Sequence, residues 1–203
     1  MKFSSKVLEQ AVNSLSALPG VGKKTALRLA LHLVQDKTQK AQQISNALTN
    51  LSLHIRTCNL CGNLSDQGIC EICNTPHRKT GLLCIVESAR DVMAIEETQQ
   101  FSGKYHVLGG VISPLDGIGP DDLNISSLLQ RIDRENIEEI IMAISPTIEG
   151  ETTIYYISKL LRNSNVKISV IARGVSFGGD LEYTDELTLG RSIKSRLPYQ
   201  FDS

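Results

Sequence analysis

The chain has 203 residues, of which 41% are hydrophobic and 21% are charged, and its formal net charge is −1. This composition is typical of a globular protein with one or two compact domains, and no segment is apolar enough to span a membrane. Because the first ten residues are too polar for a signal peptide, we expect the chain to stay in the cytoplasm. Nine aromatic residues and no tryptophan argue against a base-stacking platform for single-stranded nucleic acid.

The net charge hides an uneven distribution along the sequence. Residues 1–80 contain ten Lys or Arg and four Asp or Glu, which gives a formal charge of +6. Residues 81–203 contain eleven Lys or Arg and eighteen Asp or Glu, which gives −7. A surface that binds an anionic partner is therefore predicted within the first eighty residues.

Residues 18–34 combine a glycine turn with the start of a positively charged helix. Pro19 stiffens the turn, and Gly20 and Gly22 are expected to adopt positive φ, where side chains would clash. The backbone N–H groups that begin the helix have no partner within it and attract an anion, for which a phosphodiester is the natural candidate. The predicted DNA contacts are Gly20, Gly22, Lys23, Lys24, Thr25 and Arg28.

The helix predicted after this turn is amphipathic. Lys24, Arg28 and His32 recur every fourth residue and share one face. Its apolar face consists of Ala26, Leu27, Ala30, Leu31, Leu33 and Val34, and the preceding segment supplies a partner with Val7, Leu8, Ala11, Val12, Leu15 and Leu18. Two helices around a glycine turn resemble the helix-hairpin-helix motif, which implies binding of the DNA backbone without sequence preference. An ordinary helix pair with a solvated basic edge is the alternative, whereas the P-loop spacing is absent.

Four cysteines follow in the pattern Cys58-x2-Cys61-x8-Cys70-x2-Cys73. Two such pairs can surround one zinc ion, and a site closed by four thiolates is structural because it leaves no position for water. Disulfides are disfavoured in an intracellular chain, and an iron–sulfur cluster is the remaining alternative. One structural Zn²⁺ per chain is therefore predicted. Cys84 lies apart in an apolar run, where we expect a small buried hydrophobic residue.

The segments on either side of the cysteines carry two further patterns. Before them, apolar residues recur at three and four positions, which predicts an amphipathic helix that packs by this face. These residues are Ala41, Ile44, Leu48, Leu51 and Ile55. Basic residues flank the cysteines, and we expect them to extend the basic surface, the alternative being ordinary solvated charges. They are Arg56, His77, Arg78 and Lys79.

From residue 81 onward, short apolar runs alternate with amphipathic segments. This alternation implies a parallel sheet covered by helices, so the fold class is α/β. The predicted strands are 81–87, 105–108, 139–144 and 166–172, and helices are predicted after Ser88 and near 126–135 and 151–162. Functional groups in such sheets gather at the carboxyl ends of strands. The residues at these ends are Glu87, Ser145–Glu151 and Gly178–Asp180.

Several segments of this half resemble the Toprim region of the bacterial RecR family of recombination mediators. They are VESARDV at 86–92, YHVLGG at 105–110, SPLDGIGP at 113–120, PTIEGE at 146–151 and GGDLEY at 178–183. The order of hairpin, four-cysteine motif and Toprim region matches that family as well. The resemblance implies a multidomain chain with a helix-hairpin-helix region at 1–56, a zinc finger at 57–80, a Toprim domain at 81–176 and a C-terminal helical oligomerisation segment at 177–203.

Toprim enzymes bind magnesium with a strand-end glutamate and an Asp-x-Asp pair. This chain has Glu87 but no Asp-x-Asp, and Glu149 and Glu151 stand in its place with a different geometry. A serine, Ser145, also begins the segment that is Asn-Pro-Thr in the family. A non-catalytic role is therefore predicted, in which the three glutamates are partner contacts or weak metal ligands. A magnesium-dependent nuclease or primase is the alternative, and a protein adaptor without a DNA role is a third possibility.

A single hairpin is too weak a DNA-binding site on its own. Two or three basic side chains neutralise about three phosphates, which gives weak binding at physiological salt. Joining several copies multiplies the contacts, so we expect a homo-oligomer, either a dimer or a ring-shaped tetramer. The resemblance implies a DNA clamp that acts with RecO and RecF to help load RecA at single-strand gaps. Four apolar residues of the tail 184–199 are candidates for contacts with another subunit, the alternative being that they pack within their own subunit. They are Leu187, Leu189, Ile193 and Leu197.

Overall fold

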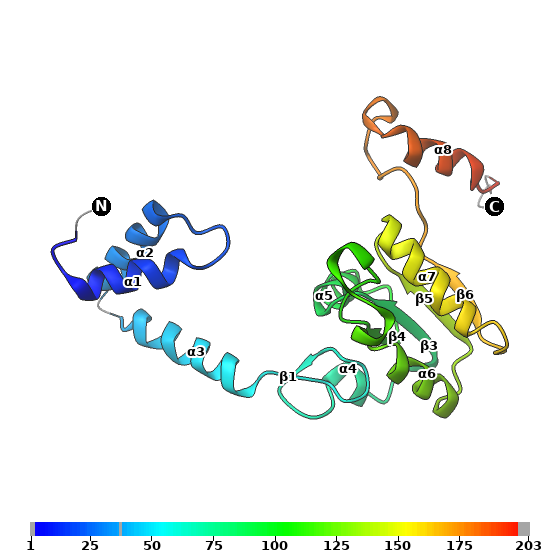
Figure 1. The fold of residues 1–203 in the computed structure, drawn as a ribbon, viewed down its shortest axis with the longest axis horizontal. Helices are drawn as coiled ribbons and strands as arrows, with labels where there is room; N and C mark the ends of the chain where they lie inside the picture. The colour runs from blue at the N-terminus through cyan, green and yellow to red at the C-terminus, as the bar shows by residue number, and fades with distance from the viewer. Residues whose placement is uncertain (1–2, 37, 199–203) are drawn as a thin grey trace. The chain divides into compact units, whose positions relative to one another are not determined.

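The computed structural model describes residues 3–36 and 38–198, and the chain divides into two compact units (Figure 1). The N-terminal unit is Met1–Ile55 and the C-terminal unit is Arg56–Ser203. Within the described part of the chain, no helix has the length and apolar character needed to cross a membrane.

The N-terminal unit consists of helices α1 (Lys6–Ser16), α2 (Lys23–Gln35) and α3 (Lys40–His54). Helix α1 begins at Ser5, whose Oγ accepts the N–H of Leu8 at 3.3 Å. Helices α1 and α2 pack together as the hairpin pattern predicts, and they bury Val12, Ala26 and Ala30 between them. Phe3, Leu8, Leu15, Val21 and Leu27 pack around this small core.

The apolar surface of this unit is wider than its core. The predicted stripe included Val7, Leu18, Leu31 and Val34, but the structure leaves all four exposed. Two helices can cover only the residues at their line of contact, and the stripe extends beyond that line. Helix α3 forms where the periodicity predicts it, yet none of its residues is buried, so the expected packing of its apolar face is wrong for the described chain.

The C-terminal unit contains a four-stranded sheet with helices on both faces. Its strands are β3 (Lys79–Val86), β4 (Gly103–Val107), β5 (Glu139–Ala143) and β6 (Lys167–Val170), and its helices include α5 (Ala89–Glu97), α6 (Ile125–Arg134) and α7 (Ile148–Leu160). The strands are all parallel and lie in the order β4-β3-β5-β6. The predicted α/β sheet is therefore confirmed, and β4 lies at one edge of it.

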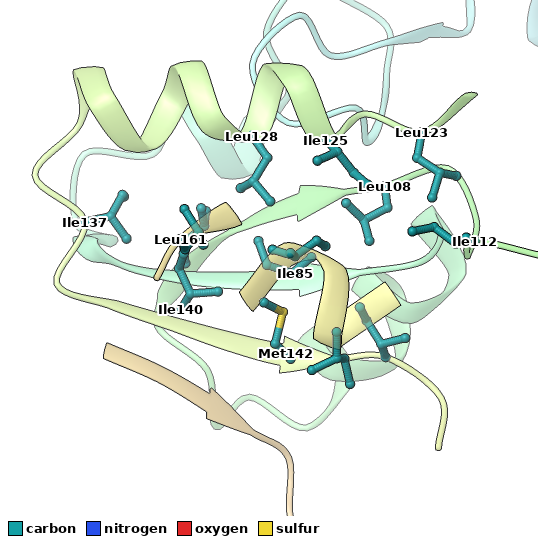
Figure 2. Packing of buried hydrophobic residues seen from close by; sticks show 14 residues of the cluster. Ile85, Leu108, Ile112, Leu123, Ile125, Leu128, Ile137, Ile140, Met142 and Leu161 are labelled. Carbon is teal, nitrogen blue, oxygen red and sulfur yellow. The ribbon is translucent and has the colours of Figure 1, made fainter. Parts of the chain in front are cut away.

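The two faces of the sheet bury alternate residues of β3 in different clusters. Leu83 and Ile85 of β3 join a cluster of fourteen buried residues, and Figure 2 shows Ile125 and Leu128 of α6 pointing toward this cluster. Cys84 lies on the opposite face, in a smaller cluster with α5. Ser88 is the N-cap of helix α5, as predicted. Its N–H and its Oγ–H both donate to the carboxylate of Asp91 in the first turn. Three-layer packing of this kind buries the sheet on both sides.

Smaller elements flank the sheet. A short antiparallel pair, β1 (Arg56–Thr57) and β2 (Leu64–Ser65), and the helix α4 (Glu71–Asn74) precede it, and α8 (Glu186–Lys194) follows it. Short 3₁₀ helices lie at Pro114–Asp116, Pro120–Asp122 and Leu181–Tyr183. In the tail, Leu187, Ile193 and Leu197 are exposed and Leu189 is half-buried, whereas Tyr199 lies outside the described residues.

Candidate nucleic-acid interface and metal centre

The glycine turn between α1 and α2 differs in one respect from its prediction. Gly20 has φ +79°, as expected, but Gly22 has φ −74° and ψ 160°, which any residue can adopt. Gly22 instead ends the turn as the N-cap of α2, and its carbonyl accepts the N–H of Ala26 at 2.9 Å. One left-handed residue is enough to reverse the chain here. A Cβ on either glycine would meet nothing within 4 Å, so the corner is open to a ligand.

The N-terminus of α2 carries no internal neutralising group. No side chain caps it and its first turn has no acidic residue, whereas Ser5 caps α1 and Thr147 caps α7. Lys23 and Lys24 are exposed at this end and Thr25 is half-buried. Uncapped N–H groups, the positive end of the helix dipole and two lysines together form an anion-attracting corner.

Three basic side chains of α2 line one open groove of about 450 Å³. Lys24, Arg28 and His32 line it from one face of the helix, as their spacing predicts. Leu27, Leu31 and Gln35 form the rest of its lining. The groove adjoins the uncapped N-terminus of α2, because Lys24 lines the groove and also lies in the first turn of the helix.

The four predicted ligand cysteines lie together. Cys58, Cys61, Cys70 and Cys73 are all buried, and their Sγ atoms lie within 4.8 Å of one another. A zinc ion at about 2.3 Å from each sulfur needs sulfurs about 3.8 Å apart, and the separations here, such as 3.5 Å between the sulfurs of Cys61 and Cys70, are close to this value. Soft thiolate donors also match zinc, so this donor set fits the ion.

Local backbone bonds shape this four-cysteine knot, which we define as residues 56–74. The N–H of Gly62 donates to the carbonyl of Cys58 at 2.9 Å, and Gly62 closes that turn with φ +72°. The N–H of Cys70 donates to Sγ of Cys58 at 3.3 Å, and Cys73 enters from α4. This N–H···S contact helps to orient the Cys58 sulfur toward a metal.

The thiols of the chain differ in acidity because their surroundings differ. The pKa of Cys73 is lowered to about 6, first because the Cys61 thiol donates to it and also because the charge of Arg131 is near. Burial raises the pKa of Cys84 to about 12. Cys84 therefore remains a neutral thiol in the sheet, which agrees with its predicted role as a small buried residue.

The basic residues around the knot do not all extend a basic surface. Arg56, His77 and Lys79 are exposed, as expected. Arg78 instead forms an ion pair with Glu96 and donates from Nη1 to the carbonyl of Gly103 at 2.9 Å. The prediction for Arg78 is therefore wrong, because its charge is satisfied by a partner distant in sequence.

Two of the three glutamates predicted for the Toprim site, Glu87 and Glu151, are engaged with other protein groups. Oε1 of Glu87, which follows β3, accepts the N–H of Ser145, which follows β5, at 2.6 Å. Glu151 forms an ion pair with Arg173, and Glu149 is half-buried in the first turn of α7. Among the described residues, no acidic side chains gather as the four cysteines do. The sequence did not predict that Arg173 pairs with Glu151. The available signal was its position just after β6, near the carboxyl ends of the strands.

Comparison with known proteins gives four matching family models. The RecR helix-hairpin-helix model matches residues 8–51, and the model of the RecR four-cysteine zinc finger domain matches residues 55–74. The Toprim domain model matches residues 81–172 and the RecR C-terminal model matches residues 174–196. The four matches fall in turn on the helices of the N-terminal unit, the four-cysteine knot, the sheet with its helices, and the tail that contains α8.

Whole-chain relatives agree with these matches. Recombination protein RecR of Amoebophilus asiaticus is 53% identical over 98% of this chain and 100% of its own length. The proteins of the same name from Porphyromonas gingivalis and Cytophaga hutchinsonii are each 52% identical over 98% of this chain, and the matches cover 96% and 98% of their own lengths. Identity at this level over the full length shows common ancestry, and the chain therefore belongs to the RecR family of recombination proteins.

Proposed function

We propose that this chain is a non-catalytic DNA-binding protein of recombinational repair, which acts in the cytoplasm. The single observation that carries the proposal is the uncapped N-terminus of α2, with Lys23 and Lys24 beside it and Arg28 in the adjoining groove. Backbone amides and long cations read phosphate rather than bases, so the binding is independent of sequence. The name of the relatives, recombination protein, supports a role in the same process.

The four-cysteine knot holds one structural Zn²⁺ in this proposal. Its four buried thiols offer no open position, so the ion organises the fold and carries no substrate. Glu87 and Glu151 are engaged by Ser145 and Arg173, which supports a Toprim domain used as a scaffold. If magnesium-dependent cleavage or primer synthesis were measured and lost in Glu87→Gln, the alternative of a Toprim enzyme would replace this part of the proposal.

Several copies of the chain act together as a clamp, either a dimer or a ring-shaped tetramer. One corner with three basic residues contacts about three phosphates, and linked copies multiply those contacts. The exposed apolar residues of α3 and of the tail are available for subunit contacts. By family resemblance, the clamp encloses DNA near single-strand gaps and acts with RecO and RecF to help load RecA.

The decisive experiment removes the charges of the α2 corner. We expect the triple variant Lys23→Ala, Lys24→Ala and Arg28→Ala to weaken DNA binding equally for unrelated sequences. Each lost phosphate contact lowers the slope of log affinity against log salt by about 0.9, so the slope falls by about 2 to 3 per corner. Binding is measured by fluorescence anisotropy on gapped duplexes of two sequences, at four salt concentrations.

A charge-matched control distinguishes a local corner from general basicity. The control variant Lys104→Ala, Lys159→Ala and Arg162→Ala removes three cations from the Toprim region, where no described ion pair uses them. We expect its salt slope to equal that of the parent chain. An equal loss in both triple variants, or in neither, would contradict the proposed interface.

A further inference from the structure

Strand β4 lies at the edge of the sheet, where half of its backbone groups face away from β3. At its end, the N–H of Leu108 points inward and donates to the carbonyl of Val86 at 2.9 Å. The preceding outward-facing residues are Tyr105 and Val107. Edge strands with free groups of this kind are open to solvent and to pairing with another strand, and proteins protect them.

Three outward groups of β4 have partners elsewhere in the C-terminal unit. The carbonyl of Val107 accepts from Nδ2 of Asn124 at 2.9 Å, and that of Tyr105 accepts from Nη1 of Arg131 at 2.7 Å. The N–H of Val107 donates to the carbonyl of Cys61 at 2.7 Å. Of these three bonds, the last alone depends on the four-cysteine knot, because Asn124 and Arg131 belong to α6 and its N-cap.

The knot approaches the edge closely at the turn of Cys61 and Gly62. A Cβ on Gly62 would lie 2.9 Å from the carbonyl oxygen of Val107 and 3.0 Å from Nδ2 of Asn124. The side chain of Ile72 packs against both the four cysteines and the sheet cluster around Val107. The knot is therefore seated directly on the strand edge.

A buried positive charge lies on the same edge. Arg131 is 5% exposed, and its Nη2 atom has no hydrogen-bond partner among the described residues. Arg131 forms an ion pair with Glu135 through Nε and donates from Nη1 to the carbonyl of Tyr105, so it holds this part of the edge independently of the knot.

We propose that metal binding by the four cysteines controls the exposure of edge strand β4, through the bond from Val107 to Cys61. With the ion bound, the turn that contains Cys61 is fixed and covers the edge. Without the ion, the turn loosens and the N–H of Val107 is released, while β4 stays paired with β3. This inference rests on the proposed metal occupancy of the knot.

The test measures amide hydrogen exchange by NMR in the full-length chain, before and after removal of the metal with a chelator. Metal content is measured first by elemental analysis. We expect the N–H of Val107 to exchange about tenfold faster after metal removal, the factor that corresponds to roughly one backbone hydrogen bond. Leu108 is an internal control in the same strand, and its exchange should stay unchanged.

Each other outcome overturns the inference in a distinguishable way. If the purified chain contained no metal, both the proposed metal occupancy of the knot and the proposed effect of the metal on β4 would be refuted. If the chain contained metal but the exchange of the Val107 N–H did not change on chelation, only the proposed effect of the metal on β4 would be refuted. Equal acceleration at Val107 and Leu108 would show that the whole sheet opens, which also contradicts selective exposure of one edge.

A pair of glycine variants tests the contact without removing a ligand. Gly62→Ala places a methyl group against the carbonyl of Val107 at a position with positive φ, so the turn must move away from the strand. We expect Gly62→Ala to retain metal and to accelerate Val107 exchange about tenfold. Gly68→Ala is the control, because its Cβ would meet only the Asn59 side chain at 3.3 Å. Equal exchange rates in the two variants would contradict the proposal.

Discussion

The two units of the chain are stabilised in different ways. The N-terminal unit buries Val12 and two alanines between α1 and α2, whereas one face of the C-terminal sheet buries a cluster of fourteen residues. Hydrophobic stabilisation follows the apolar area removed from water, so the sheet has much the larger share. The N-terminal unit therefore has a small core, whereas the C-terminal unit has a large one, although both units expose apolar residues.

The charges follow the same division. In the C-terminal unit, three arginines each form an ion pair with a glutamate, and the pairs are Arg78 with Glu96, Arg131 with Glu135 and Arg173 with Glu151. Among the described residues of the N-terminal unit, one ion pair is present, between Lys40 and Asp36. The cations of the α2 corner are thus free to neutralise an external anion.

The largest expected effect concerns the metal knot. We predict that Cys73→Ala abolishes stoichiometric metal binding, because a structural zinc site contributes on the order of 10 kcal/mol and needs all four thiolates. Cys84→Ala is the matched control, and it should keep the metal while costing on the order of 1 kcal/mol of stability. Elemental analysis and amide exchange measure both variants. Stoichiometric metal in Cys73→Ala, or loss of metal in Cys84→Ala, would contradict this prediction.

The next effect concerns the core of the sheet. Leu128 is fully buried in α6, so Leu128→Ala should lower the free energy of unfolding of the C-terminal unit by about 2 to 5 kcal/mol. Leu51→Ala, at an exposed position of α3, should change stability by no more than about 0.5 kcal/mol. Chemical denaturation followed by circular dichroism compares them. Equal losses would show that the N-terminal unit depends on apolar packing as much as the sheet does.

A smaller effect is expected from acid. Burial lowers the pKa of His106 to about 4, and its neutral ring donates from Nε2 to the carbonyl of Asn124 at 2.8 Å. The unfolded chain takes up this proton below about pH 6.5 and the folded chain only near pH 4, so stability falls across that window. The full loss from this group is roughly 3 kcal/mol.

The contribution of His106 can be isolated with His106→Gln, which keeps a donor at the same position. We predict that its stability depends less on pH between about 6.5 and 4 than that of the parent chain. Denaturant titrations at five pH values measure the difference. Parallel pH profiles for the two proteins would show that His106 does not carry this dependence.

The sequence predicted those features that depend on neighbouring residues. The spacing of Lys24, Arg28 and His32, the four cysteines and the alternation of strands with helices are local patterns, and the structure confirms the arrangement that each implies. Periodicity predicts that a helix forms but does not say what covers its apolar face, which explains the error for α3.

Features that join distant segments could not be predicted in this way. The bond between Val107 and Cys61 and the ion pair between Arg78 and Glu96 depend on how the elements of the fold pack, and no spacing in the sequence records them. The error at Gly22 has a different origin. A glycine pair shows that a turn is present, but one left-handed residue is sufficient, and composition does not say which.

The smallest effect on stability, and the sharpest test of the division between the units, comes from α3. Leu48 is 59% exposed, so Leu48→Ser should change the free energy of unfolding by no more than about 0.5 kcal/mol. If the apolar face of α3 forms a subunit contact of the proposed oligomer, the same variant weakens self-association by about tenfold, which corresponds to about 1.4 kcal/mol. Sedimentation across protein concentrations measures this, with Asn50→Ser on the opposite face as the control. Equal association of the two variants would remove α3 from the subunit interface, and the exposed apolar residues of α1 and α2 would then be the ones to test.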